Sequence, residues 1–452
     1  MKKTLITWVL AGLAFNAGSA LAAVSEQQAA KLESELTPVG AERAGNADGT
    51  IPEWTGGMTK PPAGYQPGGT RIDPFADEKP LFTIDSGNYK QYADKLTEGQ
   101  KALFEKFPKS FKMPVYPTHR TAAAPQWVYD NTRKNALSAE LIGGGDGVKN
   151  TYGGYPFPIP QNGHEVIWNH LLRWTGQGNE KTVRHVSVYP NGNRTIGGSV
   201  MWETYPYYDP DNDGATFDGS RGKVIVQYEK PVRRKGELIL VRDAVNASEI
   251  PRQAWQYIPG QRRVRRAPTI GFDSPNPEFS GLTTWDDAMM FNGSPERFDW
   301  TLVGKKELYI GYNSNGLVEA LGKGKADEIE TPYHINSEFT RWELHRVWVV
   351  EATLKEGHRH VYGKRTFYLD EDTWNIAATD IYDGRGELWR VGLANQLNAY
   401  DVPLTIIRCY SHIDLQSGAY GFNEVDRKTL KIYEGEDDKF YTPSQVRKMS
   451  RR

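Results

Sequence analysis

The stretch that decides the fold is Trp255-Gln256-Tyr257-Ile258-Pro259-Gly260-Gln261-Arg262-Arg263-Val264-Arg265-Arg266, residues 255–266. A strand-like run reaches the turn signal Pro259-Gly260, and the chain then returns in a second run that carries four arginines. Aromatic and β-branched residues on both sides of such a turn are typical of two strands that lie side by side. We therefore expect a pair of strands at 255–266.

The same alternation of short apolar runs and turn signals continues through most of the chain after about residue 180. Asn191-Gly192, Asn315-Gly316 and Asp383-Gly384 have the composition of hairpin turns. The predicted strands are 182–189, 194–204, 222–230, 236–243, 253–259, 305–312, 342–354, 360–369, 373–382, 386–394, 403–414 and 419–424. About a dozen strands in meander order predict a mainly β fold with helical additions, built on a large curved antiparallel sheet or open half-barrel.

Residues 23–178 differ in character, and we expect them to form a helical and irregular extension that packs on the sheet of residues 179–452. Apolar spacing predicts helices at 25–35, 88–106, 126–140 and 162–174. Between the first two lies a long stretch rich in Gly and Pro. Loops of that length are usually functional or lie draped over a surface.

The first residues have the pattern of a secretory signal peptide. Lys2 and Lys3 precede an apolar run from Leu5 to Phe15, and Ala20-Leu21-Ala22 offers small residues where signal peptidase cuts. The run is too short to span a bilayer, and no later segment has about 18 consecutive apolar residues. We expect cleavage after Ala22, a periplasmic location and no membrane span in the mature chain.

Composition excludes several classes of function. Removing Lys2 and Lys3 from the formal net charge of −1 leaves −3, so the chain lacks the basicity of a nucleic-acid-binding protein. Cys409 is the single cysteine, which rules out an intrachain disulfide and is expected to be a small buried residue. The 13 Trp and 24 Tyr exceed what a minimal core needs and indicate a thick β core or an amphipathic binding surface.

Several of these segments resemble a known family. The 255–266 pair, the run 341–352 and the segments 364–370 and Thr373-Trp374 resemble strands of the outer-membrane lipoprotein-sorting (LolA/LolB-like) superfamily. The stretch LTPVGAERAGNADGTIPEWTGG at 36–57 resembles the opening of an uncharacterised proteobacterial periplasmic family within it. The resemblance implies a half-barrel that holds an apolar ligand against a helical lid. It also implies an inner-membrane exporter of the resistance-nodulation-division type and an outer-membrane protein as partners.

An open barrel leaves a concave apolar face that must be covered or filled. The candidate lining residues are the aromatics Trp202, Tyr228, Trp255, Tyr257, Trp348, Phe367, Trp374 and Trp389. Alternation along the strand places Arg263 and Arg265 on one face, where they could meet anionic head groups at the cavity mouth. For each aromatic the alternative is plain core, and for the arginines it is a solvated surface.

Metal chemistry has one candidate. Asp209-Pro210-Asp211-Asn212-Asp213-Gly214 has alternating carboxylates and the glycine of a calcium loop, and Asp218 could add a ligand. The alternative is an acidic hairpin loop. His164, Glu165 and His170 do not make a zinc motif, because the second histidine would have to stand at Trp168.

The sequence thus predicts a protein that binds a hydrophobic or lipid-like molecule in the periplasm and transfers it between envelope components. We expect a binding protein and not an enzyme, with no cofactor unless calcium binds at 209–218. The alternatives are a carbohydrate-binding protein or glycan-active enzyme, for which Asp286-Asp287 would supply carboxylates, and a calcium-stabilised envelope scaffold.

Overall fold

The computed structural model describes residues 24–69, 71–212, 214–267, 272–425, 431–433 and 436–451. The expected signal peptide, residues 1–22, lies outside these ranges. Within the described ranges, none of the helices combines the length and the apolar character that crossing a membrane requires.

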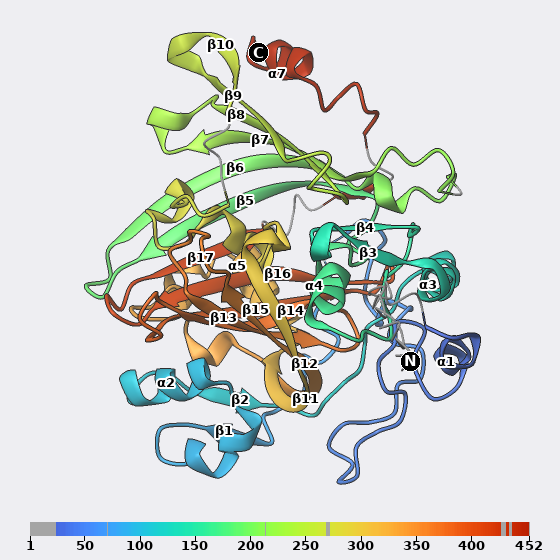
Figure 1. Ribbon diagram of the computed structural model, residues 1–452. Coiled ribbons are helices and arrows are strands. Elements are labelled where there is room, and N and C mark those ends of the chain that lie inside the picture. Colours follow the sequence, from blue (N-terminus) through green and yellow to red (C-terminus); the bar gives the residue numbers. More distant parts are fainter. Residues whose placement is uncertain are drawn as a thin grey trace, which may run out of the picture.

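Sixteen of the described strands form one large open sheet, shown in Figure 1. Its order is β1-β2-β12-β13-β14-β15-β16-β17-β5-β6-β7-β8-β9-β10, with β11 added to β12 and β18 added to β5. Neighbouring strands in the described sheet are antiparallel except at one point, where Val115 of β2 lies beside Trp342 of β12 in parallel. The predicted class, mainly β with a large curved antiparallel sheet, is confirmed.

The strands are β1 (Phe82–Ile84), β2 (Met113–Val115), β3 (Glu140–Ile142), β4 (Gly147–Lys149), β5 (Gly178–Val188), β6 (Arg194–Thr204), β7 (Ser220–Lys230), β8 (Leu238–Ala244), β9 (Gln253–Ile258), β10 (Arg263–Arg266), β11 (Phe298–Gly311), β12 (Trp342–Leu354), β13 (Lys364–Asp370), β14 (Ile376–Tyr382), β15 (Leu388–Ala399), β16 (Leu404–Asp414), β17 (Tyr420–Val425) and β18 (Lys431–Tyr433). Strands β3 and β4 form a separate hairpin. Each predicted strand has an observed counterpart.

The 255–266 hairpin forms as expected. Strand β10 pairs with β9 in the register Val264 to Tyr257, and Arg262 takes the left-handed conformation (φ +50°) that closes the turn. Asn315-Gly316, expected to be a hairpin turn, instead begins helix α5 (Asn315–Gly322), so that prediction is wrong. The buried Asn315 amide bonds to the backbone of Asn398, so a tertiary contact overrides the local turn signal.

The α-helices are α1 (Glu26–Ala29), α2 (Glu98–Lys106), α3 (Gln126–Ser138), α4 (Gly163–Leu171), α5 (Asn315–Gly322), α6 (Ala326–Ile329) and α7 (Pro443–Met449). Short 3-10 turns include η2 (Tyr89–Lys95), η4 (Pro206–Tyr208) and η8 (Trp285–Met290). The helix expected at 88–106 is divided into η2 and α2, because Leu96 is extended and Thr97 begins a new helix with a capping box to Gln100.

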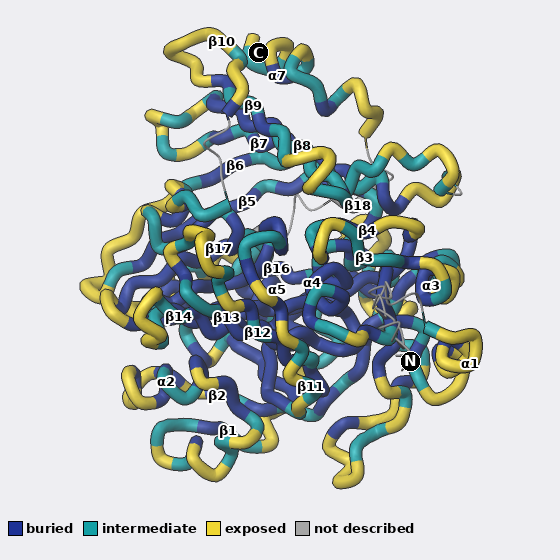
Figure 2. The backbone as a smooth tube through the Cα atoms, in the orientation of Figure 1, coloured by how far each residue is buried: buried dark blue, intermediate teal, exposed yellow. Residues whose placement is uncertain are grey.

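Helical segments cover both faces of the sheet around strand β15. A Cβ on Gly99 of α2 would meet Val391 of β15, whereas a Cβ on the next strand residue, Gly392, would meet Met290 of η8. Successive strand residues point to opposite faces, so α2 and η8 lie on opposite sides of β15. Helix α4 packs on β11 and β12. Figure 2 shows the resulting deep burial of the central strands.

The N-terminal residues are tied to the turn between β13 and β14. The Arg120 guanidinium donates to both carboxylate oxygens of Asp372 (2.9 and 2.7 Å) and to the backbone carbonyl of Glu42 (2.8 Å). The Trp374 indole donates to the carbonyl of Val39 (3.0 Å), and Trp374 is fully buried. These contacts fix residues 39–43 on the sheet.

A separate small core lies at the far end of the sheet. Val446 of helix α7 and Tyr441, just before the helix, pack against the apolar face of β7, β8 and β9, on which Ile225 and Leu240 are fully buried. Figure 1 shows α7 beside β10, remote from α4 and α2. The C-terminal helix therefore covers the face that carries the 255–266 pair.

The Arg120 contacts predict a strong effect of Arg120→Met. The change leaves the buried Asp372 carboxylate without its cation, and breaking a buried ion pair costs about 3–5 kcal/mol. We expect that loss in the free energy of unfolding, measured by urea titration. The matched control is Arg133→Met, which removes an exposed ion pair with Glu33 and should cost at most about 1 kcal/mol. Equal losses in both variants would contradict the role given to Arg120.

Candidate ligand-binding site

A cavity of about 150 Å³ lies between the middle of the sheet and the segments that cover it. Strands β16, β17, β5, β6, β7 and β8 supply one wall, and the end of α4, the 3-10 turn η4 and the end of η8 supply the other. The cavity thus lies where the curved sheet meets its helical cover. That is the place where the fold leaves a concave surface to be filled.

One part of the cavity wall is apolar. Leu171 and Leu172 end the amphipathic helix α4, Met289 and Phe291 come from η8 and the residue after it, and Ile407 comes from β16. Ile406 and Val224 complete this part. These side chains could pack against a hydrocarbon segment.

The other part is polar and mainly cationic. It contains the cations Arg173, Lys181, Arg221, Lys223 and Arg408 and the carboxylates Glu203 and Asp243. Both carboxylates are engaged. Lys181 bonds to Glu203 (2.7 Å), and Asp243 accepts from Arg221 (2.9 Å) and from Arg252 (2.7 Å). Positive charge therefore exceeds negative charge in the wall.

Tyrosines surround the polar part. Tyr205 donates to Glu203 (2.9 Å), and Tyr208 donates to the carbonyl of Leu172. Tyr207 contacts the hydroxyl of Thr151 (2.6 Å) and donates to the carbonyl of Gly154 (2.7 Å). The Tyr208 bond holds η4 against the end of α4, and the Tyr207 bonds hold it against residues 151–154.

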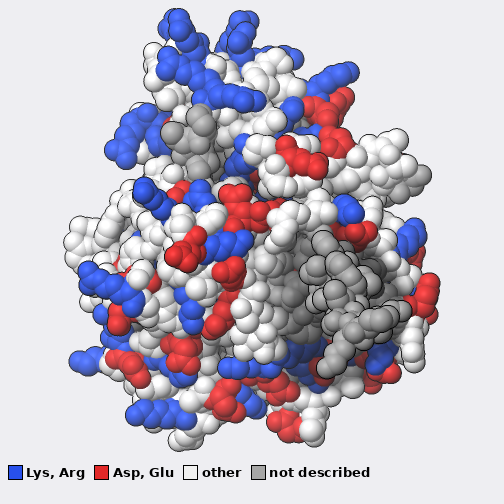
Figure 3. Space-filling view, viewed as in Figure 1, with Lys and Arg blue, Asp and Glu red and all other residues white. Residues whose placement is uncertain are grey.

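The ten residues predicted to contact a ligand lie elsewhere. Trp202, Trp255 and Tyr257 belong to the small core beneath α7. Tyr228 is buried on the opposite face, where it bonds to Glu278 and stacks on Arg234. Arg263 and Arg265 are exposed on β10, in the region where Figure 3 shows Lys and Arg gathered at one end of the molecule.

The remaining four lie in or beside the main core. Phe367 and Trp374 are fully buried, Trp348 is half-buried and stacks on Trp374 (6.0 Å), and Trp389 donates to Asp414 (2.9 Å). Among the residues that the structure describes, none of the ten lines the cavity of about 150 Å³. Their part in ligand binding stays a prediction.

The residues that line the cavity were not among those predicted from the sequence to bind a ligand. Arg173 follows the apolar Leu171-Leu172 at the end of the predicted helix 162–174, and a cation within an apolar run was the available signal. Arg221 and Asp243 lie on the neighbouring strands β7 and β8, and Arg408 reaches the same cavity from β16, far away in the sequence. No short window of the sequence shows this set. Cys409, beside Arg408, is buried in the core.

The acidic loop at 209–218 is built from side-chain to backbone bonds. Asp209 accepts from the amide of Asp211 (3.0 Å), and Asp218 accepts from the amide of Ser220 (2.8 Å). These are the bonds of Asx turns. Asp213 lies outside the described residues, and calcium binding at the loop stays a prediction.

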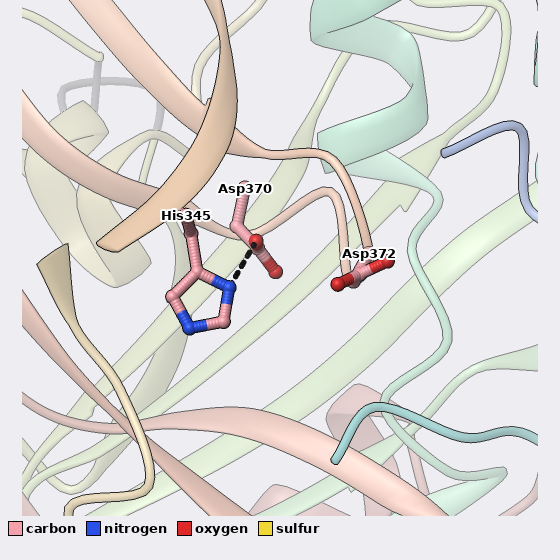
Figure 4. A group of neighbouring side chains, drawn as sticks. All are labelled: His345, Asp370 and Asp372. Carbon is pink, nitrogen blue, oxygen red and sulfur yellow. Dashed lines mark ion pairs between the residues drawn. The ribbon is translucent and has the colours of Figure 1, made fainter. Parts of the chain in front are cut away.

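A second group of chemistry-bearing side chains, His345, Asp370 and Asp372, is buried between the sheet and the N-terminal residues (Figure 4). The His345 Nδ1 atom is 3.8 Å from Asp370 Oδ1, and Thr373 donates to the other Asp370 oxygen (2.6 Å). Asp372 is already engaged by Arg120. Burial and the Asp372 carboxylate raise the pKa of Asp370 to about 7.

The raised pKa predicts a pH-dependent effect of Asp370→Asn. In the unfolded chain this carboxyl titrates near 3.8, so between that pH and about 7 the folded protein holds a proton that the unfolded chain has released. The stability contributed by Asp370 is therefore lost progressively as the pH rises from about 4 and is fully lost above about 7. Asparagine has no proton to release, so its advantage in free energy of unfolding should be about 1–3 kcal/mol larger at pH 8 than at pH 5.

Urea unfolding at the two pH values measures this difference. Asp130→Asn is the control, because Asp130 is exposed on α3 and should show no such change between pH 5 and pH 8. If Asp370→Asn changed the free energy of unfolding by the same amount at pH 5 and pH 8, Asp370 would not be protonated in the folded protein at pH 5, and the prediction would be wrong.

The chain matches one family of known proteins over most of its length. A family model described as protein of unknown function (DUF1329) matches residues 83–447, a range that includes parts of both predicted domains. The uncharacterized protein PA3922 of Pseudomonas aeruginosa is 43% identical over 457 residues, which cover 99% of this chain and 99% of that protein.

Two solved structures are also similar to this chain. A DUF1329 family protein from Desulfovibrio piger is 14% identical, with 60% of this chain and 92% of that chain covered and a TM-score of 0.41. A putative outer membrane lipoprotein-sorting protein domain from Vibrio parahaemolyticus is 13% identical, with 63% and 97% covered and a TM-score of 0.43. The predicted membership of an uncharacterised family is confirmed: the chain belongs to the DUF1329 family.

Proposed function

We propose that the protein binds a hydrophobic or lipid-like molecule in the periplasm and passes it between envelope components. Its partners would be an inner-membrane exporter of the resistance-nodulation-division type and an outer-membrane protein. The observation that carries the proposal is the cavity between the curved sheet and its helical cover, with an apolar wall of Leu171, Met289, Phe291 and Ile407. The signal-peptide pattern before residue 23 supports the location.

The side chains of the cavity favour binding over catalysis. Among the described residues that line it there is no serine, cysteine or histidine to act as a nucleophile or its base. Its two carboxylates are held in ion pairs. The pair Asp286-Asp287, considered for acid–base chemistry, is buried and bonds to Arg365 (2.9 Å) and to Tyr362 (2.6 Å). These carboxylates hold β13 and the residues just before it to η8.

Native mass spectrometry of the protein purified from its own periplasm tests the proposal directly. We expect a bound mass that disappears under denaturing conditions and that extraction into organic solvent identifies as an amphiphile. A protein that carries no such mass, before and after incubation with envelope lipids, would contradict the proposal.

A cavity-filling variant tests the location. Leu171→Trp adds a large side chain at the cavity wall, and Leu171 is only half-buried, so the fold can accept the extra volume at a cost of about 1–3 kcal/mol. We expect the affinity for the uncharged probe dodecanol, measured by calorimetric titration, to fall at least tenfold. The control is Ile196→Trp, which adds the same side chain at an exposed position on β6. Equal probe affinity in the two variants would place the binding site elsewhere.

A further inference from the structure

The cavity described above contains an arginine whose charge no carboxylate balances in the described part of the chain. Arg173 makes no ion pair with a described Asp or Glu, and its Nη1 atom bonds only to His170, at the backbone carbonyl (2.6 Å) and the ring (3.3 Å). Its Nε atom is shielded from solvent and has no acceptor among those residues. A buried donor without an acceptor costs free energy, so such an atom calls for a partner.

The electrostatic surroundings of Arg173 are also unfavourable to a lone cation. Burial lowers the pKa of Arg173 to about 10, the nearby tyrosines offset part of that change, and the charge of Arg221 lowers the pKa further. Arg221 lines the same cavity, and its two side-chain bonds, to Asp243 and to Asn292, both leave from one nitrogen, Nη2. An arginine presents five N–H donors, so both guanidinium groups retain capacity for an anion.

We propose that this cavity holds the oxyanion head group of a single-chain amphiphile, a carboxylate or a phosphate, with Arg173 as its principal partner and Arg221 as the second. The hydrocarbon chain leaves along Leu171, Met289 and Ile407. This inference rests on the proposed function and names the class of ligand. Guanidinium groups bind both oxyanions through paired N–H bonds, which suits either head group.

The size of the cavity fits a ligand whose head group is bound inside and whose hydrocarbon chain extends out of the cavity. A volume of about 150 Å³ accommodates a group of roughly the size of benzene. It takes a head group and the first methylenes, whereas drug-sized ligands occupy about 300–1,000 Å³. Lys181 is paired with Glu203, and Arg221 is paired with Asp243. Both carboxylates among the described wall residues are therefore engaged, and neither is left for a ligand cation.

Calorimetric titration of the mature chain with matched ligands tests the inference. The ligands are dodecyl phosphate, dodecanoate, dodecanol and inorganic phosphate, each below its micellar concentration where it has one. We expect both anionic amphiphiles to bind at least tenfold more tightly than dodecanol. Arg173→Gln should remove that preference, leave dodecanol affinity unchanged within about twofold and leave the melting temperature unchanged or higher, because it deletes an unpaired cation. Arg173→Lys should restore part of the preference.

The control variant is Arg133→Gln, an exposed arginine on α3 that should change nothing. Equal affinity for dodecanol and the anionic amphiphiles overturns the inference while leaving the proposed function intact, and so does an Arg173→Gln variant that keeps the preference. Inorganic phosphate that binds as tightly as dodecyl phosphate shows a site for free oxyanions and also overturns it. If no amphiphile binds, both proposals fail. If Arg173→Gln does not fold, the comparison of the ligands on the unaltered chain decides.

Discussion

Three consecutive carboxylates, Asp370, Glu371 and Asp372, are buried in the turn between β13 and β14, and the remainder of the structure depends on how their charge is balanced. Charges removed from water must be paired, because the cost of burying them alone exceeds the stability of an ordinary domain. Asp370 pairs with no Lys or Arg of the described chain, and burial raises its pKa to about 7. The cations that pair with Glu371 and Asp372 come from three different places. Arg120 belongs to the N-terminal residues, Lys305 to β11 and Arg346 to β12.

That balance explains why the irregular N-terminal residues are ordered against the sheet. A Gly- and Pro-rich stretch has little regular hydrogen bonding of its own, so its position has to be fixed by contacts with the rest of the chain. Arg120 supplies one contact at Asp372, and the same guanidinium bonds to the backbone of Glu42. Trp374, at φ +58° in the same turn, supplies another at Val39. The turn therefore holds two separate segments of the extension at one point.

The sequence allowed the strands to be predicted because their signals are local. Alternating β-branched and aromatic runs and the Asn191-Gly192 and Asp383-Gly384 turns are visible in short windows, and the strands lie where those windows placed them. The cavity could not be predicted in the same way. Arg173, Arg221 and Arg408 are brought together by strand pairings that span more than two hundred residues. Aromatic content pointed instead to Trp255 and Tyr257. These two residues pack with Val446 of α7 and with Tyr441 before it.

Aromatic side chains and cations thus have different roles in this chain. Trp374, Phe367 and Tyr228 are fully or almost fully buried in apolar clusters, where removing their rings from water stabilises the fold. A charged group gains nothing from such burial unless something pairs with it. The balanced carboxylates of the β13–β14 turn show the chain pairing its buried charges within itself. Arg173 differs from that pattern. Within the described chain its side chain hydrogen-bonds only to His170, and its shielded Nε atom has no acceptor there. The proposed ligand position therefore rests on an unbalanced charge and not on an accumulation of aromatic rings.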